Sequence, residues 1–225
     1  MSRPDEMSEL RSLRAQVAEL TRALAERDQP VPADLLRTIV EGTASNTGEE
    51  FFQSLVRHLA QTLKVRYALV GEWRQESPAT IRTLALWSGA ALAEQFEYSL
   101  QNTPCDNVLN QRLCLYESGV QRLFPEDQYL VQMDVDSYCG MPLFDRSGKP
   151  LGVLVVMDDR PMTNAAIVKD LLQIFGARAA AELQRQQDEA TLREHEAGLV
   201  AAQDLAHLGS WEWDIQTGTE QWSAE

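Results

Sequence analysis

Three consecutive segments of the sequence carry most of the structural information. They read Ser137-Tyr138-Cys139-Gly140-Met141-Pro142-Leu143-Phe144, then Asp145-Arg146-Ser147-Gly148-Lys149-Pro150, then Leu151-Gly152-Val153-Leu154-Val155-Val156-Met157. Two apolar runs flank a polar turn that contains Ser-Gly, which predicts a strand, a loop and a returning strand. The returning run is apolar at odd and even positions alike, so it is typical of a central strand covered on both faces.

The residues before this pair predict a helix and three further strands. Thr47 and Glu50 have the spacing of a capping box, and an apolar stripe from Phe51 to Leu63 follows at helical spacing. Strands are expected over 65–73, 81–87 and 96–100. A helix, three strands, a crossover, two strands and a helix predict an α+β fold with a mainly antiparallel sheet.

The succession of these segments resembles the GAF domain, a small-molecule sensor module of bacterial signalling proteins. The resemblance includes the strand pair at 137–157 and the segments 100–109, 116–120, 123–127 and 158–162. It implies a six-stranded twisted sheet with the N- and C-terminal helices on one face and a ligand pocket on the other. It implies pocket-lining segments at 105–109 and 123–129, together with Trp87 and Tyr138. The candidate pocket residues singled out from this set are Trp87, Cys105, Asp106, Val108, Leu109, Leu123, Phe124, Asp127 and Tyr138.

Composition narrows the possible partners. The 225 residues include 20 Lys and Arg against 34 Asp and Glu, which gives a formal net charge of −14. Such a negative field repels phosphate backbones and anionic lipid, so we expect neither nucleic-acid binding nor membrane insertion. The longest apolar run is far shorter than a membrane span, and the N-terminus has no apolar signal core. Three cysteines without an export signal indicate reduced thiols in the cytoplasm.

The first segment, residues 1–29, predicts a coiled-coil helix. Its apolar residues are spaced 3, 4, 3 and 4 apart, as positions a and d of a heptad require: Leu10, Leu13, Val17, Leu20 and Leu24. We therefore expect a parallel homodimer, with a solitary amphipathic helix as the alternative. Residues 30–46, which begin with two prolines in three positions, are expected to be a linker and helix start before a GAF core at 47–162.

Residues 163–207 predict a long outgoing helix. No proline interrupts this segment, and its apolar stripe includes Val168, Leu172, Phe175 and Ala179. A helix of some forty residues would be about 60 Å long, which favours pairing with a second copy of itself through these residues. The segment resembles the signalling helices that link sensor modules in dimeric receptors. The alternative is a break near Gly198 with the chain folding back.

The last segment, residues 208–225, resembles the opening of a PAS domain. Trp211, Trp213 and Ile215 alternate as one face of a strand, and Thr217-Gly218 is expected to turn it. Because two isolated strands are marginal in water, we expect the natural chain to continue. The resemblance implies a sensor histidine kinase or a diguanylate cyclase as the downstream effector.

The sequence gives little support for catalysis by this chain. It has no phosphate-binding glycine loop, and its three histidines have no metal-ligand spacing. One alternative uses Cys105, Cys114 and Cys139, because the free methionine-(R)-sulfoxide reductases place three cysteines around a GAF pocket. A redox-responsive thiol at Cys105 is a related possibility. The remaining interpretation is that the cysteines are small buried apolar residues.

No cofactor is identified by the sequence. The Cys-His pair of bilin-binding GAF domains and the Asn-Lys-Phe-Asp-Glu signature of cyclic-nucleotide-binding ones are both missing, and an axial ligand for haem would have to come from His58 or a cysteine. We therefore expect a sensory module that dimerises through helices and binds an apolar or aromatic small molecule or no ligand.

Overall fold

A computed structural model describes residues 37, 46–75, 78–110, 113–206, 211–214 and 217–222. Contacts divide the chain into two compact units, residues 1–181 and 182–225. None of the helices within the described ranges combines the length and apolar character that a membrane span requires.

A single antiparallel sheet forms the centre of the first unit. Its strands are β1 (Tyr67–Arg74), β2 (Thr80–Ser88), β3 (Ala91–Leu92), β4 (Glu97–Ser99), β5 (Cys114–Tyr116), β6 (Ser137–Phe144) and β7 (Pro150–Asp158). They lie in the order β3-β2-β1-β7-β6-β5, and β4 also pairs with β2. The predicted α+β fold is confirmed, with seven strands in place of six because β3 and β4 pair separately with β2.

Strand β7 is central, as its double-sided apolar pattern predicts. It pairs with β1 on one side and β6 on the other. Val153, Val155 and Met157 point into the core on one face of the sheet, whereas Leu154 and Val156 lie on the other face and are completely buried. The alternation follows from the two-residue period of a strand.

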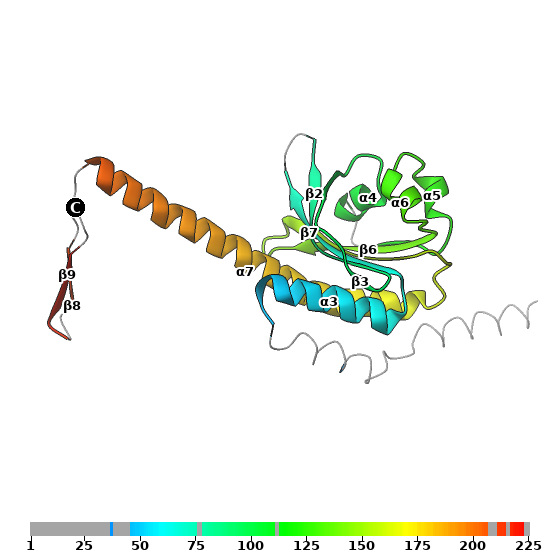
Figure 1. Cartoon of the computed structure of the whole chain (residues 1–225), viewed down its shortest axis with the longest axis horizontal. Helices are drawn as coiled ribbons and strands as arrows, with labels where there is room; N and C mark the ends of the chain where they lie inside the picture. Colours follow the sequence, from blue (N-terminus) through cyan, green and yellow to red (C-terminus); the bar gives the residue numbers. More distant parts are fainter. Residues whose placement is uncertain are drawn as a thin grey trace, which may run out of the picture. The chain divides into compact units, whose positions relative to one another are not determined.

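Helices cover both faces of the sheet (Figure 1). On one face lie α3 (Gly48–Leu63) and the first turns of α7 (Ala165–Ala206); on the other lie α4 (Pro104–Asn110), α5 (Val120–Leu123) and α6 (Gln128–Gln132). Thr47 precedes α3 as predicted, but its side chain makes no capping hydrogen bond. The predicted capping box is therefore wrong, and Gly48 begins the helix with a positive φ of 67°.

The start of α7 packs against the sheet within its own chain. A side chain at Gly176 would meet the sulfur of Met141 on β6 at 2.8 Å, and the guanidinium of Arg178 lies over the ring of Phe51 on α3. This packing corrects the prediction that four apolar residues of α7 contact a second chain. These residues are at most 2% exposed in the single chain, so they are not available to a second copy: Val168, Leu172, Phe175 and Ala179.

The second unit contains the remainder of α7 and a two-stranded hairpin. The helix continues through Gly198 without a break, contrary to the fold-back alternative. Strands β8 (Trp211–Asp214) and β9 (Thr219–Trp222) pair across a turn at Gly218, whose φ is 69°. The predicted coiled-coil positions Leu10, Leu13, Val17, Leu20 and Leu24 lie outside the described residues.

Candidate functional site

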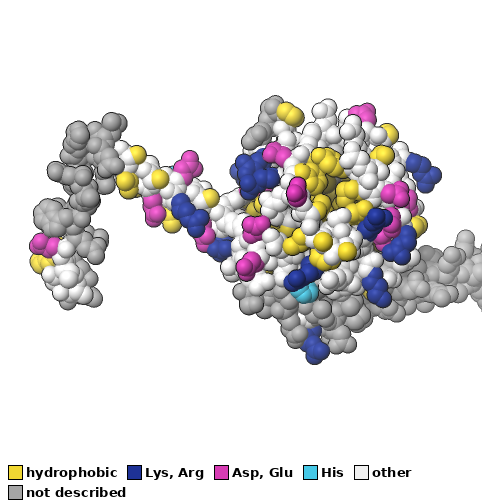
Figure 2. Space-filling view, viewed as in Figure 1, with side chains coloured by type: hydrophobic (Ala, Val, Ile, Leu, Met, Phe, Trp, Pro, Cys, Tyr) yellow, Lys and Arg dark blue, Asp and Glu magenta, His cyan; other side chains and the backbone are white. Residues whose placement is uncertain are grey.

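A cavity lies on the face of the sheet that carries α4 and α6. Its volume is about 40 Å³, which is room for a few water molecules. Ligand pockets are usually about 300–1,000 Å³, so any larger occupant requires the wall to rearrange. Figure 2 shows hydrophobic side chains gathered around a hollow on this side of the molecule. The lining residues are Leu69, Leu86, Phe96, Tyr98, Pro104, Cys105, Asp127, Tyr129, Leu130, Met133, Tyr138, Val155 and Met157.

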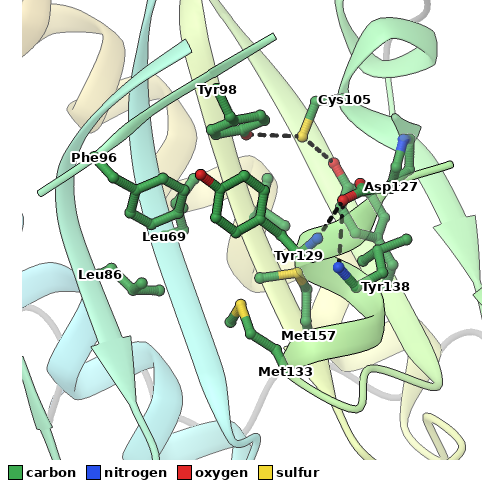
Figure 3. A pocket seen from close by; sticks show the side chains of 13 residues that line it. Leu69, Leu86, Phe96, Tyr98, Cys105, Asp127, Tyr129, Met133, Tyr138 and Met157 are labelled. Atoms are coloured by element: carbon green, nitrogen blue, oxygen red, sulfur yellow. Dashed lines mark hydrogen bonds between the residues drawn. The ribbon is translucent and has the colours of Figure 1, made fainter. Parts of the chain in front are cut away.

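A hydrogen-bonded chain of three side chains crosses the upper wall (Figure 3). The sulfur of Cys105 lies 3.1 Å from the hydroxyl of Tyr98 and 3.2 Å from that of Tyr138. Cys105 comes from α4, Tyr98 from β4 and Tyr138 from β6, so the chain ties three elements together. Burial raises the pKa of both tyrosines well above its ordinary value and that of Cys105 to about 11, so all three groups are neutral at physiological pH.

Asp127 is the one acidic residue among the described residues of the wall. It precedes α6, and its Oδ1 accepts hydrogen bonds from the backbone N–H groups of Tyr129 at 3.0 Å and Leu130 at 3.3 Å. Its side chain caps a short helix, which fixes it at the cavity. Burial raises the pKa of its carboxyl, and the two backbone N–H groups offset part of that rise.

Aromatic rings form the side of the cavity between β4 and α6. Tyr129 stacks on Phe96 with a centroid distance of 4.7 Å, and Tyr98 lies 5.7 Å from Phe96 and 5.9 Å from Tyr129. Tyr129 is 39% exposed, so it lies between the cavity and solvent. In Figure 3 the methionines Met133 and Met157 lie below these rings. The site is therefore an aromatic and thioether pocket with one carboxylate.

The structure brings three of the predicted pocket residues to the cavity wall: Cys105, Asp127 and Tyr138. Val108, Leu109 and Phe124 belong to, or pack against, the core cluster on this face and do not line the cavity. Asp106 and Leu123 are exposed, the latter by 60%. These two side chains lie outside the cavity because the residues around them on α4 and α5 occupy the buried face.

The structure corrects the prediction that Trp87 lines the pocket. It pairs with Ala68 in the sheet register, and its neighbour Leu86 pairs with the cavity residue Leu69. One residue along a strand changes the face, so Trp87 points to the side of α3. There it lines a separate depression with Gln61 and Arg66.

Most of the wall was missed by the sequence reasoning. Phe96 and Tyr98 are separated by two positions in a segment predicted as a strand, so their shared face could have been derived. Leu69, Val155 and Met157 likewise follow from strand alternation once the buried face is chosen. Tyr129 falls at the end of the predicted pocket segment 123–129, and the structure places it in the wall. Met133 carries no comparable signal, because the position of α6 over the sheet is set by tertiary packing.

The three cysteines do not meet at one site. Cys114 on β5 pairs with Gly140 on β6. Cys139 is the neighbour of Gly140 along β6, so its side chain lies on the opposite face of the sheet. Cys105 and Cys114 lie in the cavity-side core. Burial raises the pKa of Cys105 to about 11, although its hydrogen bonds with Tyr138 and Tyr98 act to lower it. Burial raises the pKa of Cys139 to about 12, although Lys169 of α7 lowers it.

The side chains that commonly bind metal ions do not form a cluster within the described residues. Among the described residues, no group of three or more His, Cys, Asp or Glu side chains is arranged to hold an ion. All three cysteines are free and buried.

Comparisons with known proteins agree with this architecture. A sequence model of the GAF domain matches residues 47–183. No curated protein sequence matches the chain.

Solved structures of several GAF-containing proteins resemble the chain. The GAF domain of an Acinetobacter phosphoenolpyruvate-protein phosphotransferase has a TM-score of 0.55 and 17% identity, over 72% of this chain and 99% of that one. The chromophore-binding domain of Stigmatella aurantiaca phytochrome P1 has a TM-score of 0.54 and 11% identity, over 68% and 61%. The A. aeolicus nlh2 GAF domain in an inactive state has a TM-score of 0.52 and 13% identity, over 68% and 96%. At these identities the likeness shows the fold.

Proposed function

The chain belongs to the GAF domain family, sensory and ligand-binding modules of signalling proteins, and we propose that it senses a small molecule and relays occupancy to its outgoing helix. The observation that carries the proposal is the placement of the cavity and α7 on opposite faces of one sheet. Along β6, Tyr138 lines the cavity while Met141 contacts α7 at Gly176. A shift of this strand therefore alters both sites.

The proposed relay ends in a homodimer. In the first unit α7 leaves Ile174, Ala177 and Ala181 exposed at spacings of three and four, which is a helical stripe on the side away from the sheet. Together with the predicted coiled coil at 1–29, this stripe supports pairing of two chains in parallel. The output would be a PAS domain beginning at 208 and, beyond it, a histidine kinase or diguanylate cyclase of a two-component or related system.

The proposed function is not catalytic, and we propose that the protein acts in the cytoplasm. Free cysteines support a reducing compartment. The sulfoxide reductase alternative is not supported over this one, because it requires three thiols around one pocket and Cys139 lies on the far face of the sheet.

A titration tests both halves of the proposal. We would record amide NMR spectra of the chain while adding a set of small apolar and aromatic molecules. A ligand should shift the signals of cavity residues such as Leu69 and Val155 and also those of α7 between 165 and 181. Val155→Leu adds one methylene to the cavity and should weaken binding, whereas Val131→Leu makes the same change at a side chain that is 56% exposed.

The possible failures differ in meaning. Shifts confined to the cavity would contradict the relay and leave ligand binding in place. Binding that is equal in Val155→Leu, Val131→Leu and the unmodified chain would place the ligand outside this cavity.

A further inference from the structure

The cavity wall has an unusual charge balance. Among the described residues that line it there is no lysine, arginine or histidine, and Asp127 is the one acidic side chain. An anionic ligand would therefore find no opposite charge in the wall and would meet a carboxylate. The described wall therefore supplies none of the arginine or lysine partners with which phosphate-bearing ligands pair.

Within the described part of the chain, the carboxyl of Asp127 has no cationic partner. The hydrogen bonds to its side chain are those from the two backbone N–H groups that donate to Oδ1. Its side chain is only 9% exposed, and buried carboxylates are ordinarily paired with a cation because desolvation of an isolated charge is costly. A ligand cation in the cavity would supply the missing charge.

The neighbouring rings suit such a cation. Phe96, Tyr98 and Tyr129 lie with their centroids within 6 Å of one another and line the same cavity as Asp127. The faces of aromatic rings attract ammonium groups, most strongly where water is excluded. The remaining wall, with Leu69, Leu86 and Met157, would contact an apolar substituent on the same ligand.

One side chain is positioned to admit the ligand. Tyr129 is partly exposed on the short helix α6, and its interactions are ring contacts with Phe96 and Tyr98 together with its backbone bonds. No described residue forms a hydrogen bond with its hydroxyl. Rotation of Tyr129 away from Phe96 would thus enlarge a cavity of about 40 Å³ without breaking a hydrogen bond of this side chain.

We propose that this cavity recognises a small organic ammonium ion carrying an apolar substituent, with Asp127 as its counter-ion and Phe96, Tyr98 and Tyr129 around its charged group. This inference rests on the proposed sensory function and names its ligand class. The electrostatics of the wall agree with it. Burial chiefly raises the pKa values of Tyr98 and Cys105, and the Asp127 charge adds to the rise, so negative charge is disfavoured at these groups.

Three probes of the same length separate charge from shape. Butylammonium, butanol and butyrate each contain a linear skeleton of four carbon atoms and carry a positive, a neutral and a negative head group at neutral pH. Binding to the chain at physiological salt would be followed by the amide NMR signals of cavity residues. Butylammonium should bind most tightly and butyrate most weakly.

Two variants and one control variant identify the side chains that cause the expected preference for butylammonium. Asp127→Asn keeps an N-cap oxygen for α6 and removes the charge, so it should weaken butylammonium binding about tenfold or more without changing butanol binding. Phe96→Leu should weaken butylammonium binding while keeping the wall apolar. Glu126→Gln removes the same charge one residue away, at an exposed side chain that does not line the cavity, and should leave all three affinities unchanged.

Equal binding of butanol and butylammonium, or an unchanged butylammonium affinity in Asp127→Asn, would overturn the ammonium assignment while the cavity remained a ligand site. Tightest binding of butyrate would do the same. If none of the three probes shifted cavity signals, the assignment would also fail. The sensory proposal is judged separately by whether any other small molecule shifts those signals.

Discussion

Cys105 and Cys139 show how burial controls reactivity at single side chains. Both thiols are more than 90% buried, and their pKa values are raised to about 11 and about 12 from an ordinary value of 9.0. Because the thiolate is the reactive form, both cysteines should be inert in the folded protein. The redox-sensing alternative at Cys105 requires the opposite behaviour.

Alkylation with iodoacetamide at pH 8, followed by peptide mass spectrometry, measures the reactivity of the two buried thiols directly. A pKa raised by two units lowers the thiolate fraction about 100-fold, so Cys105 should react at least about 100-fold more slowly in the folded chain than in urea. Rapid modification of Cys105 in the folded chain would revive the redox-sensing alternative.

Asp127 combines a structural role with a charge at the cavity. As an N-cap it stabilises α6, and Asp127→Ala should lower the free energy of unfolding by about 0.5–2 kcal/mol. Asp127→Asn should retain most of the cap. Urea unfolding of the two variants at pH 7 separates the cap from the charge, and equal losses in both would show that the cap is not what the side chain contributes.

The same carboxyl gives a pH dependence with a defined sign. Burial raises the pKa of Asp127 in the folded chain, so the folded state holds its proton more tightly than the unfolded state does. This contribution to stability is present below the unfolded pKa and is lost as pH rises through the folded pKa. The stability of Asp127→Asn relative to the natural chain should therefore increase from pH 3 to pH 7, and a decrease would contradict the raised pKa.

Strand alternation decides how far sequence could predict the site. It identified β7 as a central strand, and the resemblance implied Cys105, Asp127 and Tyr138 at the cavity. The resemblance also implied Trp87, which is wrong by one position, because a displacement of one residue along β2 exchanges the two faces of the sheet. Met133 could not be assigned, because it follows α6, a single short turn whose position depends on distant contacts.

Close approach of β1 and β7 explains a glycine in the central strand. A Cβ at Gly152 would lie 2.1 Å from the carbonyl oxygen of Gly71, and that oxygen belongs to backbone that cannot move without disturbing the sheet. Gly152→Ala should therefore lower the free energy of unfolding by about 1–3 kcal/mol.

Urea unfolding followed by circular dichroism measures this loss. Gly198→Ala is the matched control, because nothing lies within 4 Å of the added methyl group and it sits in α7 of the second unit. That control should raise helix stability slightly. An unfolding midpoint of Gly152→Ala equal to that of the natural chain would show that the strands separate more easily than the structure implies.

The two halves of α7 differ in what stabilises them. The first half is buried on the sheet, whereas the second carries ion pairs along its surface, including Arg185 with Glu182 at 2.6 Å and with Glu189. Exposed pairs of this kind contribute little each, so the proposed dimer would be the larger source of stability for the second half. The sequence predicted the length of this helix but placed the dimer contacts on the residues that the sheet buries. Helical periodicity alone does not distinguish a stripe packed on its own sheet from one packed on a second chain.

Two chains are expected to associate through faces that the first unit leaves open and through the predicted heptads. Ile174→Asp should weaken the dimer without loss of fold, since this side chain is 45% exposed. Leu13→Asp combined with Leu20→Asp should have a similar effect. Analytical ultracentrifugation at micromolar concentration measures both, and an unchanged dimer in all variants would place the interface elsewhere.

Native mass spectrometry of the purified chain, under conditions gentle enough to retain small molecules, tests the sensory account most directly. The account predicts a dimer that carries one discrete additional mass per chain, and loss of that mass in Val155→Leu but not in Val131→Leu. A monomer at the bare sequence mass would contradict both the occupied cavity and the helical pairing on which the relay depends.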